Sequence, residues 1–318
     1  MDAYICTPEQ ITATIEKYGV AIVPNVLDAI EIKEMQDGMF DFLEHVTAKF
    51  EKPIDRNNTD TFVEFYKLYP NHGMLLQHWQ VGHAQFIWNL RQNPKVVDAF
   101  AKVWKCAPED LLCSYDGASF HLSAEITKRG KFRSFWYHTD QSYTRPDFEC
   151  IQSWVTAYDV NEGDATLAFI EGSHKHHAEF QKTFDVKDKN DWYPVKKEEL
   201  DFYTKHLGLT EKKITCPAGS LVLWDSRTIH CGVQHGNREK VNFRCVAYIC
   251  MTPRALATKA ALKKHITAFE SIRMTSHWPH KPKLFPKNPQ TYGAMLPETQ
   301  ELAEPPKLTD LGKRLVGY

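Results

Sequence analysis

The sequence predicts an antiparallel all-β core that is flanked by α-helices at both ends of the chain. From about residue 111 onward, short runs of Val, Ile, Leu, Phe, Tyr and Trp alternate with Gly, Pro, Asp and Asn, as the strands of a β-sandwich do. Before and after that region, apolar residues recur at helical spacing. With 318 residues, of which 42% are hydrophobic, the chain is long enough to bury a substantial core.

We expect one domain over residues 1–318. Its parts are an N-terminal helical flank with one or two strands (1–107), a β core that carries the chemistry (108–253), and a C-terminal helix and tail packed on the core (254–318). The sequence contains no internal repeat and no low-complexity segment that would mark a linker.

Helix and strand signals divide the N-terminal flank. Thr7 is a suitable N-cap for a first helix, and Gly19 is a typical residue after its end. The β-branched run VAIV that follows predicts a strand, and residues 28–46 return to helical spacing. Residues 84–107 predict two helices, because Pro94 suits the first turn of the second one.

Five apolar runs are the predicted strands of the core. They are LLCSYDGASFHLS, ECIQSWVTAYDV, ATLAFIEG, SLVLWDS and VNFRCVAYIC. One longer polar helical stretch, residues 178–206, interrupts them. The segment RALATKAALKKHITAFESI predicts a helix after the core, and the proline-rich tail behind it carries four apolar side chains that we expect to pack along the body: Trp278, Phe285, Tyr292 and Leu311.

Composition excludes several classes of function. The 39 Lys and Arg balance 40 Asp and Glu, so the formal charge is −1 and no overall field attracts nucleic acid or an anionic membrane. No run approaches the roughly 18 apolar residues of a spanning helix. The eight cysteines form no CxxC pair, and the opening MDAYICTPEQ lacks the features of a signal peptide. We therefore expect a cytoplasmic protein that binds neither nucleic acid nor membrane; its oligomeric state is open.

The motif His138-Thr139-Asp140 is the sharpest chemical signal. Side chains two apart in extended chain point to the same side, so the imidazole and the carboxylate can converge on one point. A third ligand follows far downstream, where the apolar run 220–225 leads to His230. Two histidines and one carboxylate form the facial triad of non-haem Fe(II) oxygenases, which leaves three metal positions open.

Arg244 lies in the middle of an apolar strand, VNFRCVAY. A buried guanidinium is costly unless an anion pairs with it. A 2-oxo acid can fill two open metal positions and O2 the third, and the far carboxylate of 2-oxoglutarate suits the planar, bidentate side chain of Arg. The ordered set of HxD, a long insert, His and then Arg is therefore consistent with one site that binds a metal ion and 2-oxoglutarate together.

In these stretches the chain resembles the phytanoyl-CoA dioxygenase-like family of Fe(II)/2-oxoglutarate-dependent oxygenases. The resemblance rests on HTDQSYTRPDFECIQSWVTAYDVNEGDATLAFIEGSHK, AGSLVLWDSRTIHCG and NREKVNFRCVAY, with the opening KYGVAIVPNVLDAIEIKEM, and these span most of residues 10–250. It implies a double-stranded β-helix, or jelly-roll, core with flanking helices.

The resemblance also implies the roles of five side chains. His138, Asp140 and His230 would bind Fe(II), Arg244 would clamp 2-oxoglutarate, and Trp154 would lie beside this cosubstrate, with O2 as the second cosubstrate. Arg244 follows the distal histidine by 244 − 230 = 14 positions, further than is usual in the family. Arg238 is therefore a rival for the clamp, although it lies among loop residues.

The expected function is an Fe(II)/2-oxoglutarate-dependent dioxygenase that hydroxylates a small-molecule substrate and releases succinate and CO2. Two alternatives stay open. One is a catalytically silent family member that acts as a binding or scaffold protein. The other is a jelly-roll metalloenzyme that does not use 2-oxoglutarate. The sequence does not name the substrate, because the residues that select it lie on loops and flanking helices.

Other conspicuous residues have simpler interpretations. His235 follows Gly232 into a turn, so we expect a solvated loop histidine rather than the metal ligand. For the cluster His174, His176 and His177 we expect no second metal site, because the resemblance implies that Gly172-Ser173-His174 is a structural turn. The basic run Lys128, Arg129, Lys131 and Arg133 is expected to be a solvated hairpin. Some of the aromatic residues beside the HxD motif are expected to line a substrate cavity, and most to be core: Phe132, Phe135, Trp136, Tyr137 and Tyr143.

Overall fold

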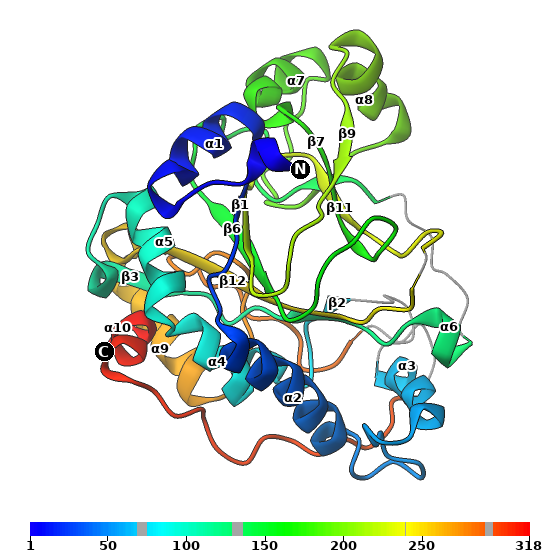
Figure 1. The fold of residues 1–318 in the computed structure, drawn as a ribbon. Helices are drawn as coiled ribbons and strands as arrows, with labels where there is room; N and C mark the ends of the chain where they lie inside the picture. The colour runs from blue at the N-terminus through cyan, green and yellow to red at the C-terminus, as the bar shows by residue number, and fades with distance from the viewer. Residues whose placement is uncertain (69–74, 129–135, 239, 290–294) are drawn as a thin grey trace.

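The structure is a computed structural model that describes residues 1–68, 75–128, 136–238, 240–289 and 295–318. Within them, two antiparallel sheets face each other, which confirms the predicted jelly-roll core with flanking helices (Figure 1). The larger sheet has the order β1-β10-β6-β12-β4-β2, with β3 also paired to β12, and the smaller one has the order β8-β5-β11-β7-β9.

The strands are short except for β12, which crosses the whole molecule. In the larger sheet they are β1 (Val20–Val23), β2 (Leu75–Leu76), β3 (Leu111–Cys113), β4 (Ala118–His121), β6 (Ile151–Thr156), β10 (Leu221–Asp225) and β12 (Arg244–Pro253). In the smaller sheet they are β5 (His138–Thr139), β7 (Thr166–Ile170), β8 (Tyr193–Pro194), β9 (Glu211–Lys213) and β11 (His230–Val233).

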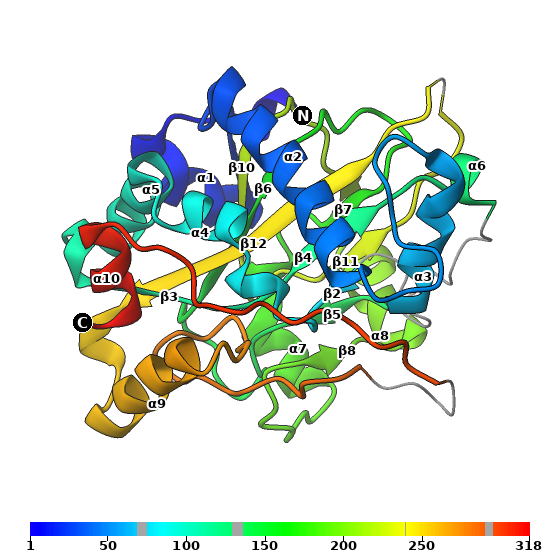
Figure 2. The same cartoon turned by 90° about the horizontal axis from the view of Figure 1, so that it is seen from below.

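The helices are α1 (Ile11–Tyr18), α2 (Ala29–Val46), α3 (Phe65–Leu68), α4 (Gln85–Arg91), α5 (Pro94–Trp104), α6 (Ala124–Thr127), α7 (His177–Thr183), α8 (Lys197–Asp201), α9 (Lys259–Glu270) and α10 (Asp310–Val316). Several of them cover the outside of the larger sheet, and the region of α7 and α8 packs on the outside of the smaller one (Figure 1). Figure 2 shows α2 and α4 crossing β12 on its outer face. No described helix combines the length and the apolar character that crossing a bilayer requires.

Strand register sorts the side chains of the larger sheet into two faces. Trp154 of β6 is paired with Val222 of β10 and with Tyr248 of β12, so these side chains share the face toward the smaller sheet. Val222 and Trp154 belong to the apolar cluster between the sheets. The alternate residues, such as Leu223 and Cys245, pack instead under the helices. The sandwich interior is thus built from every second residue of each strand.

Helix ends agree with the predicted boundary residues Thr7, Gly19 and Pro94, and Asp28 adds a cap that was not predicted. The Thr7 capping box precedes α1, and Gly19 ends α1 in the left-handed region at φ 85°. Asp28 accepts hydrogen bonds from two backbone N–H groups at the start of α2, and Pro94 occupies the first turn of α5.

The predicted long helical stretch over residues 178–206 is wrong. Helix α7 ends at Thr183, and the chain then forms β8, α8 and a π-helical turn, Phe202–His206. Asp185 has a positive φ of 48°, and β8 is held by pairing with β5. The polar run DVKDKNDW between these elements offers no apolar stripe that could bury a continuous helix.

The C-terminal segment contains a helix that the sequence analysis did not predict. Thr309 caps α10 through its side chain, and Gly317 follows it at φ 112°. Helix α10 contacts β3, and Trp278 of the preceding tail is buried. Tyr292 of the predicted tail lies outside the described residues. The single-domain organisation of residues 1–318 stays a prediction.

Candidate metal centre and cosubstrate site

His138, Asp140 and His230 come together at one end of the smaller sheet. His138 of β5 and His230 of β11 are directly paired across the two antiparallel strands, and Asp140 follows β5. The carboxylate Oδ2 of Asp140 lies 3.2 Å from Nε2 of His230 and 3.6 Å from Nε2 of His138. One ligand atom from each of the three lies within 4.8 Å of the others, and all three residues are buried.

Both histidines have their tautomer fixed by a backbone carbonyl. Nδ1 of His138 lies 2.9 Å from the carbonyl oxygen of Trp136, and Nδ1 of His230 lies 2.9 Å from that of Thr228. A carbonyl oxygen can only accept, so each Nδ1 carries the hydrogen and donates it. The lone pair of each Nε2 is then free for a metal ion, and the ring orientation is set before any ion arrives.

The Asp140 carboxylate is buried without a Lys or Arg partner among the described residues. Burial by itself would raise its pKa, but the neighbouring His138, His277 and His230 outweigh burial and hold the pKa well below the ordinary value. Burial would likewise lower the pKa of His138, and the Asp140 charge raises it above its usual value instead. A buried carboxylate beside two imidazole nitrogens is the donor set that a borderline divalent cation complements.

Gln152 is a functional residue that the sequence analysis missed. It lies on β6 of the opposite sheet, and its Nε2 donates a 2.7 Å hydrogen bond to Oδ2 of Asp140. It is two residues before Trp154 and therefore shares the inner face of that strand. The two-residue spacing from Trp154 indicates only that Gln152 is on the inner face, and not that it contacts Asp140.

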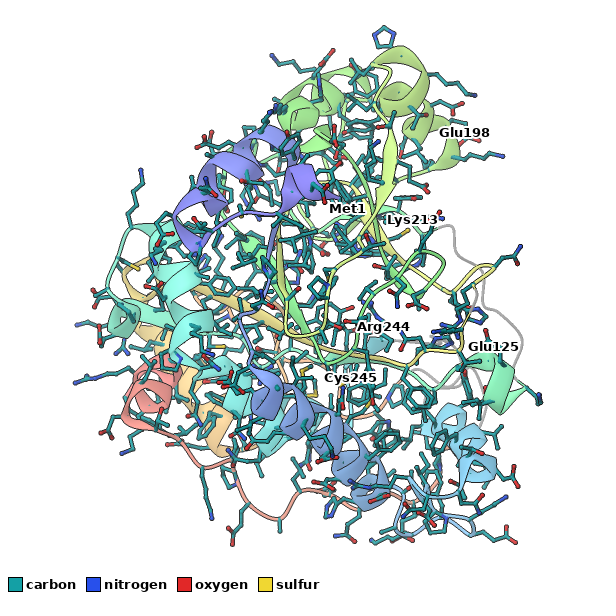
Figure 3. The ribbon with its side chains drawn as sticks, viewed as in Figure 1. Met1, Glu125, Glu198, Lys213, Arg244 and Cys245 are labelled. Atoms are coloured by element: carbon teal, nitrogen blue, oxygen red, sulfur yellow. The ribbon has the colours of Figure 1, made fainter. Side chains whose placement is uncertain are left out.

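Arg244 begins β12 and has its guanidinium inside the sandwich. Nε donates to Oγ of Ser119 at 3.0 Å, Nη1 donates to the carbonyl oxygen of Ala165 at 3.1 Å, and the guanidinium lies 5.5 Å from the ring centre of Trp154. Among the described residues no carboxylate lies within ion-pair distance of it. Figure 3 shows Arg244 on the side of β12 toward the smaller sheet and its neighbour Cys245 on the side of α2. A buried, permanently charged group without an anion is suited to receive one from a ligand.

Arg238 has different surroundings. Its guanidinium pairs with Glu125 at 2.8 Å and with Asp164 at 2.9 Å. The same hydrogen-bonded guanidinium lowers the pKa of Glu125 to about 2. With two carboxylates already bound, Arg238 has little capacity left for a cosubstrate.

His235 corrects one expectation from the sequence. It was expected to be a solvated loop histidine, but it is buried and its ring stacks on that of His121 at 5.3 Å. The loop between β11 and β12 folds inward here, because Arg238 further along it is bound to Glu125 of α6. His235 is not part of the metal cluster.

The remaining conspicuous residues separate into core, surface and undescribed groups. His174 and His177 are buried and hydrogen-bond backbone carbonyls, and the described residues hold no second cluster of metal-ligand type. Tyr137 and Tyr143 belong to an apolar cluster on the far side of the smaller sheet, whereas the Trp136 ring stacks on His138. The predicted basic and aromatic residues Arg129, Lys131, Phe132, Arg133 and Phe135 lie outside the described residues, and Lys128 is exposed.

A jelly roll that brings two histidines and a carboxylate together fits the class of non-haem iron oxygenases. Comparison with protein families agrees with this class, because the model of the phytanoyl-CoA dioxygenase family (PhyH) matches residues 15–238. The chain belongs to the phytanoyl-CoA dioxygenase family. Membership of this family and the cluster of two histidines and one aspartate support the predicted cofactors, which are iron, 2-oxoglutarate and O2.

One curated relative and two solved structures illustrate the range of similarity. "Ava biosynthesis cluster protein O" of Aspergillus versicolor is 30% identical over 212 residues; the match covers 64% of this chain and 66% of the relative, a little under two thirds of its length. A Salmonella typhimurium LT2 protein provisionally described as an oxidoreductase has a TM-score of 0.61 at 14% identity, over 99% of this chain and 86% of its own. At 14% identity, the similarity to the Salmonella protein shows the fold alone.

A third similar protein is the epimerase SnoN from nogalamycin biosynthesis, solved in complex with Fe3+, alpha-ketoglutarate and nogalamycin RO. It is 16% identical, with a TM-score of 0.48 over 77% of this chain and 83% of its own. Because the TM-score is below 0.5, the reaction of SnoN does not indicate the chemistry of this chain.

Proposed function

We propose that the protein uses Fe(II), 2-oxoglutarate and O2 to hydroxylate a small-molecule substrate, with release of succinate and CO2. The observation that carries the proposal is the convergence of His138, Asp140 and His230 within 4.8 Å. We propose these three as the metal ligands, with Arg244 and Trp154 as the cosubstrate-binding residues, in a protein located in the cytoplasm.

The residues fit the metal and the cosubstrate. The donor set is two imidazole nitrogens with free lone pairs and one buried carboxylate, which suits a borderline divalent ion and leaves part of its coordination sphere open. On the neighbouring sheet, the buried Arg244 provides a guanidinium for a carboxylate. A dianion that chelates the metal at one end would have its far carboxylate bound at the other.

In this proposal the chain's residues bind, orient and exclude water. The bound iron supplies the oxidative chemistry that no side chain can perform. Gln152 and the two backbone carbonyls hold the ligands in one orientation, and Arg244 against Trp154 fixes the direction of the cosubstrate. The two sheets keep bulk water away, since all of the proposed ligands are buried.

The test is a comparison of the wild-type chain with His230→Ala under anaerobic and aerobic conditions. Calorimetry with Ni(II) and then 2-oxoglutarate should show sequential binding in the wild type and neither event in the variant. After Fe(II) and air are supplied, succinate should form in the wild type only. Metal binding without 2-oxoglutarate binding would favour a jelly-roll metalloenzyme of another kind. Binding of both without succinate, across a broad substrate panel, would favour a silent binding protein.

A further inference from the structure

Two indole rings border the candidate metal centre. The Trp136 ring stacks on the imidazole of His138, with ring centres 4.9 Å apart and an angle of 21° between the planes. The Trp192 ring lies 5.9 Å from the same imidazole at 39°. Trp136 is 36% exposed and Trp192 is 52% exposed, whereas Trp154 and Trp224 of the sandwich interior are buried. Exposed large apolar rings beside a reaction centre mark a surface for a ligand.

Strand register places the two rings on opposite sides of His138 along strand β5. Trp136 precedes His138 by two residues on the same chain segment. Trp192 precedes Pro194 of β8 by two residues, and Pro194 is paired with His138 across antiparallel strands. A step of two residues keeps a side chain on the same face, and antiparallel strands step in opposite directions. Both rings therefore flank the imidazole on the face that carries the metal ligands, one toward each end of β5.

The polar groups around these rings are already engaged. Nε1 of Trp136 donates to the carbonyl oxygen of Gly232 at 2.8 Å, which fixes that ring. Asp191, next to Trp192, forms an ion pair with Arg145. The hydroxyl of Tyr193 donates to Glu199 at 2.9 Å. Among the residues that the structure describes, this border therefore offers a ligand aromatic surface rather than a free charge.

We infer that the substrate presents a flat, uncharged aromatic ring, which the Trp136 and Trp192 indoles hold next to the metal centre. The inference rests on the proposed function and adds the substrate class to it. Aromatic rings prefer offset-stacked or edge-to-face contact with one another, and such contact favours a ring over an aliphatic group of equal size. The stacking also orients the ring plane relative to the metal, so that one edge of the substrate faces the reaction centre.

The experiment uses the protein loaded anaerobically with Ni(II) and 2-oxoglutarate, because no turnover then occurs. Loading is measured first by calorimetry, and its failure would count against the proposed function rather than against this inference. Two neutral probes of the same backbone are then titrated, N-acetyltryptophanamide and N-acetylleucinamide. The aromatic probe should bind roughly 3- to 10-fold more tightly than the aliphatic one. Equal binding of the two probes to the loaded protein would overturn the inference.

Variants of Trp192 separate aromatic contact from apolar bulk. Trp192→Phe should keep most of the preference for N-acetyltryptophanamide, and Trp192→Leu should reduce it, since only the Trp136 ring then remains. Phe184→Leu is the matched control, since Phe184 is similarly exposed at 38% but lies after α7 and makes its ring contacts with Phe180 and Phe202. It should leave the preference as in the wild type. An undiminished preference in Trp192→Leu would show that the ring of Trp192 does not select the ligand.

Discussion

Arg238 and Arg244 are six residues apart, and the side chains of both are almost completely removed from water. Arg238 forms ion pairs with Glu125 and Asp164. These pairs connect the β11–β12 loop to α6 and to the segment before β7. Arg244 contacts Ser119, a backbone carbonyl and the face of Trp154, which are neutral groups. Because their partners differ, removal of the two guanidinium groups should have different effects on cosubstrate binding and on stability.

Replacing Arg244 by Ala should raise the 2-oxoglutarate concentration required for half-maximal turnover. Loss of a buried charge partner costs about 2–5 kcal/mol, which corresponds to roughly 30-fold or more. Arg244→Lys should recover part of this loss, since it keeps the charge but not the bidentate geometry. Arg238→Ala should instead lower the free energy of unfolding and change the cosubstrate requirement little. Succinate formation and urea unfolding of all three variants measure this, and a larger cosubstrate effect in Arg238→Ala would reverse the assignment.

Gln152 should matter for metal affinity although it is not a proposed ligand. Its hydrogen bond orients the Asp140 carboxylate, and loss of such an outer contact typically weakens metal binding about 10- to 100-fold. Gln152→Leu should therefore bind Ni(II) more weakly in calorimetry. Ser153→Ala is the control, because Ser153 is equally buried on the same strand but donates to the carbonyl of Ile249 on the other face. Unchanged Ni(II) affinity in Gln152→Leu would remove the positioning role.

At the scale of elements, Gly19 links the end of α1 to the loop that leads to His230 of β11. Its carbonyl oxygen accepts from the backbone N–H of Asp225 and from the hydroxyl of Thr228, both at 3.1 Å. The carbonyl of Thr228 in turn fixes the His230 tautomer. A Cβ at Gly19 would lie 2.6 Å from Oγ1 of Thr228 and 2.8 Å from Nδ1 of His174. The N-terminal helix thus supports the metal centre through one glycine.

Gly19→Ala should destabilise the fold and weaken metal binding together. The left-handed φ alone costs an L-residue about 1–2 kcal/mol, and the two close contacts add to that cost. Gly208→Ala is a matched control, because Gly208 has a φ of +68° and no atom within 4 Å of an added Cβ. Urea unfolding should show a larger loss for Gly19→Ala, and Ni(II) calorimetry should show weakened binding for that variant only. If Gly19→Ala and Gly208→Ala lost the same free energy of unfolding and the same Ni(II) affinity, Thr228 would have to move aside freely.

Local chemistry decided which elements could be predicted from the sequence. Asp28 and Pro94 mark helix starts by hydrogen bonding and by a preset φ, so α2 and α5 began where predicted. The short strand β9, Glu-Lys-Lys, has no local signal, because pairing with β7 alone makes it a strand. The misread stretch 178–206 fails for the same reason, since β8 exists through its pairing with β5.

The candidate site also contains residues that the sequence was enough to predict and residues that it was not. Spacing within the chain was enough to pair His138 with Asp140, and an arginine in an apolar strand was enough to single out Arg244. Gln152 reaches Asp140 from the other sheet, so no spacing along the chain reports that contact. The burial of His235 depends on how its loop folds over α6, which is a property of the tertiary structure.

For the whole molecule, buried histidines outside the metal centre make stability depend on pH. Burial lowers the pKa of His83 and of His121 to about 3 and that of His280 to about 4, from an ordinary value of 6.5. The folded protein therefore keeps these rings neutral, while the unfolded chain binds protons as the pH falls below 6.5. Stability from this source is complete above pH 6.5 and declines as the pH falls toward 4.

The metal-free protein should thus lose free energy of unfolding between pH 7.5 and pH 5.5, by about 1 kcal/mol for each such histidine. Urea unfolding at several pH values measures the slope. His83→Gln removes one titrating group; its ring nitrogen Nε2 donates to the carbonyl of Arg273, which a glutamine amide can also do. That variant should show a shallower slope by up to one proton, because it has no imidazole to protonate on unfolding. A slope equal to that of the wild type would show that His83 binds the same number of protons in the folded and the unfolded chain, which contradicts a pKa lowered by burial.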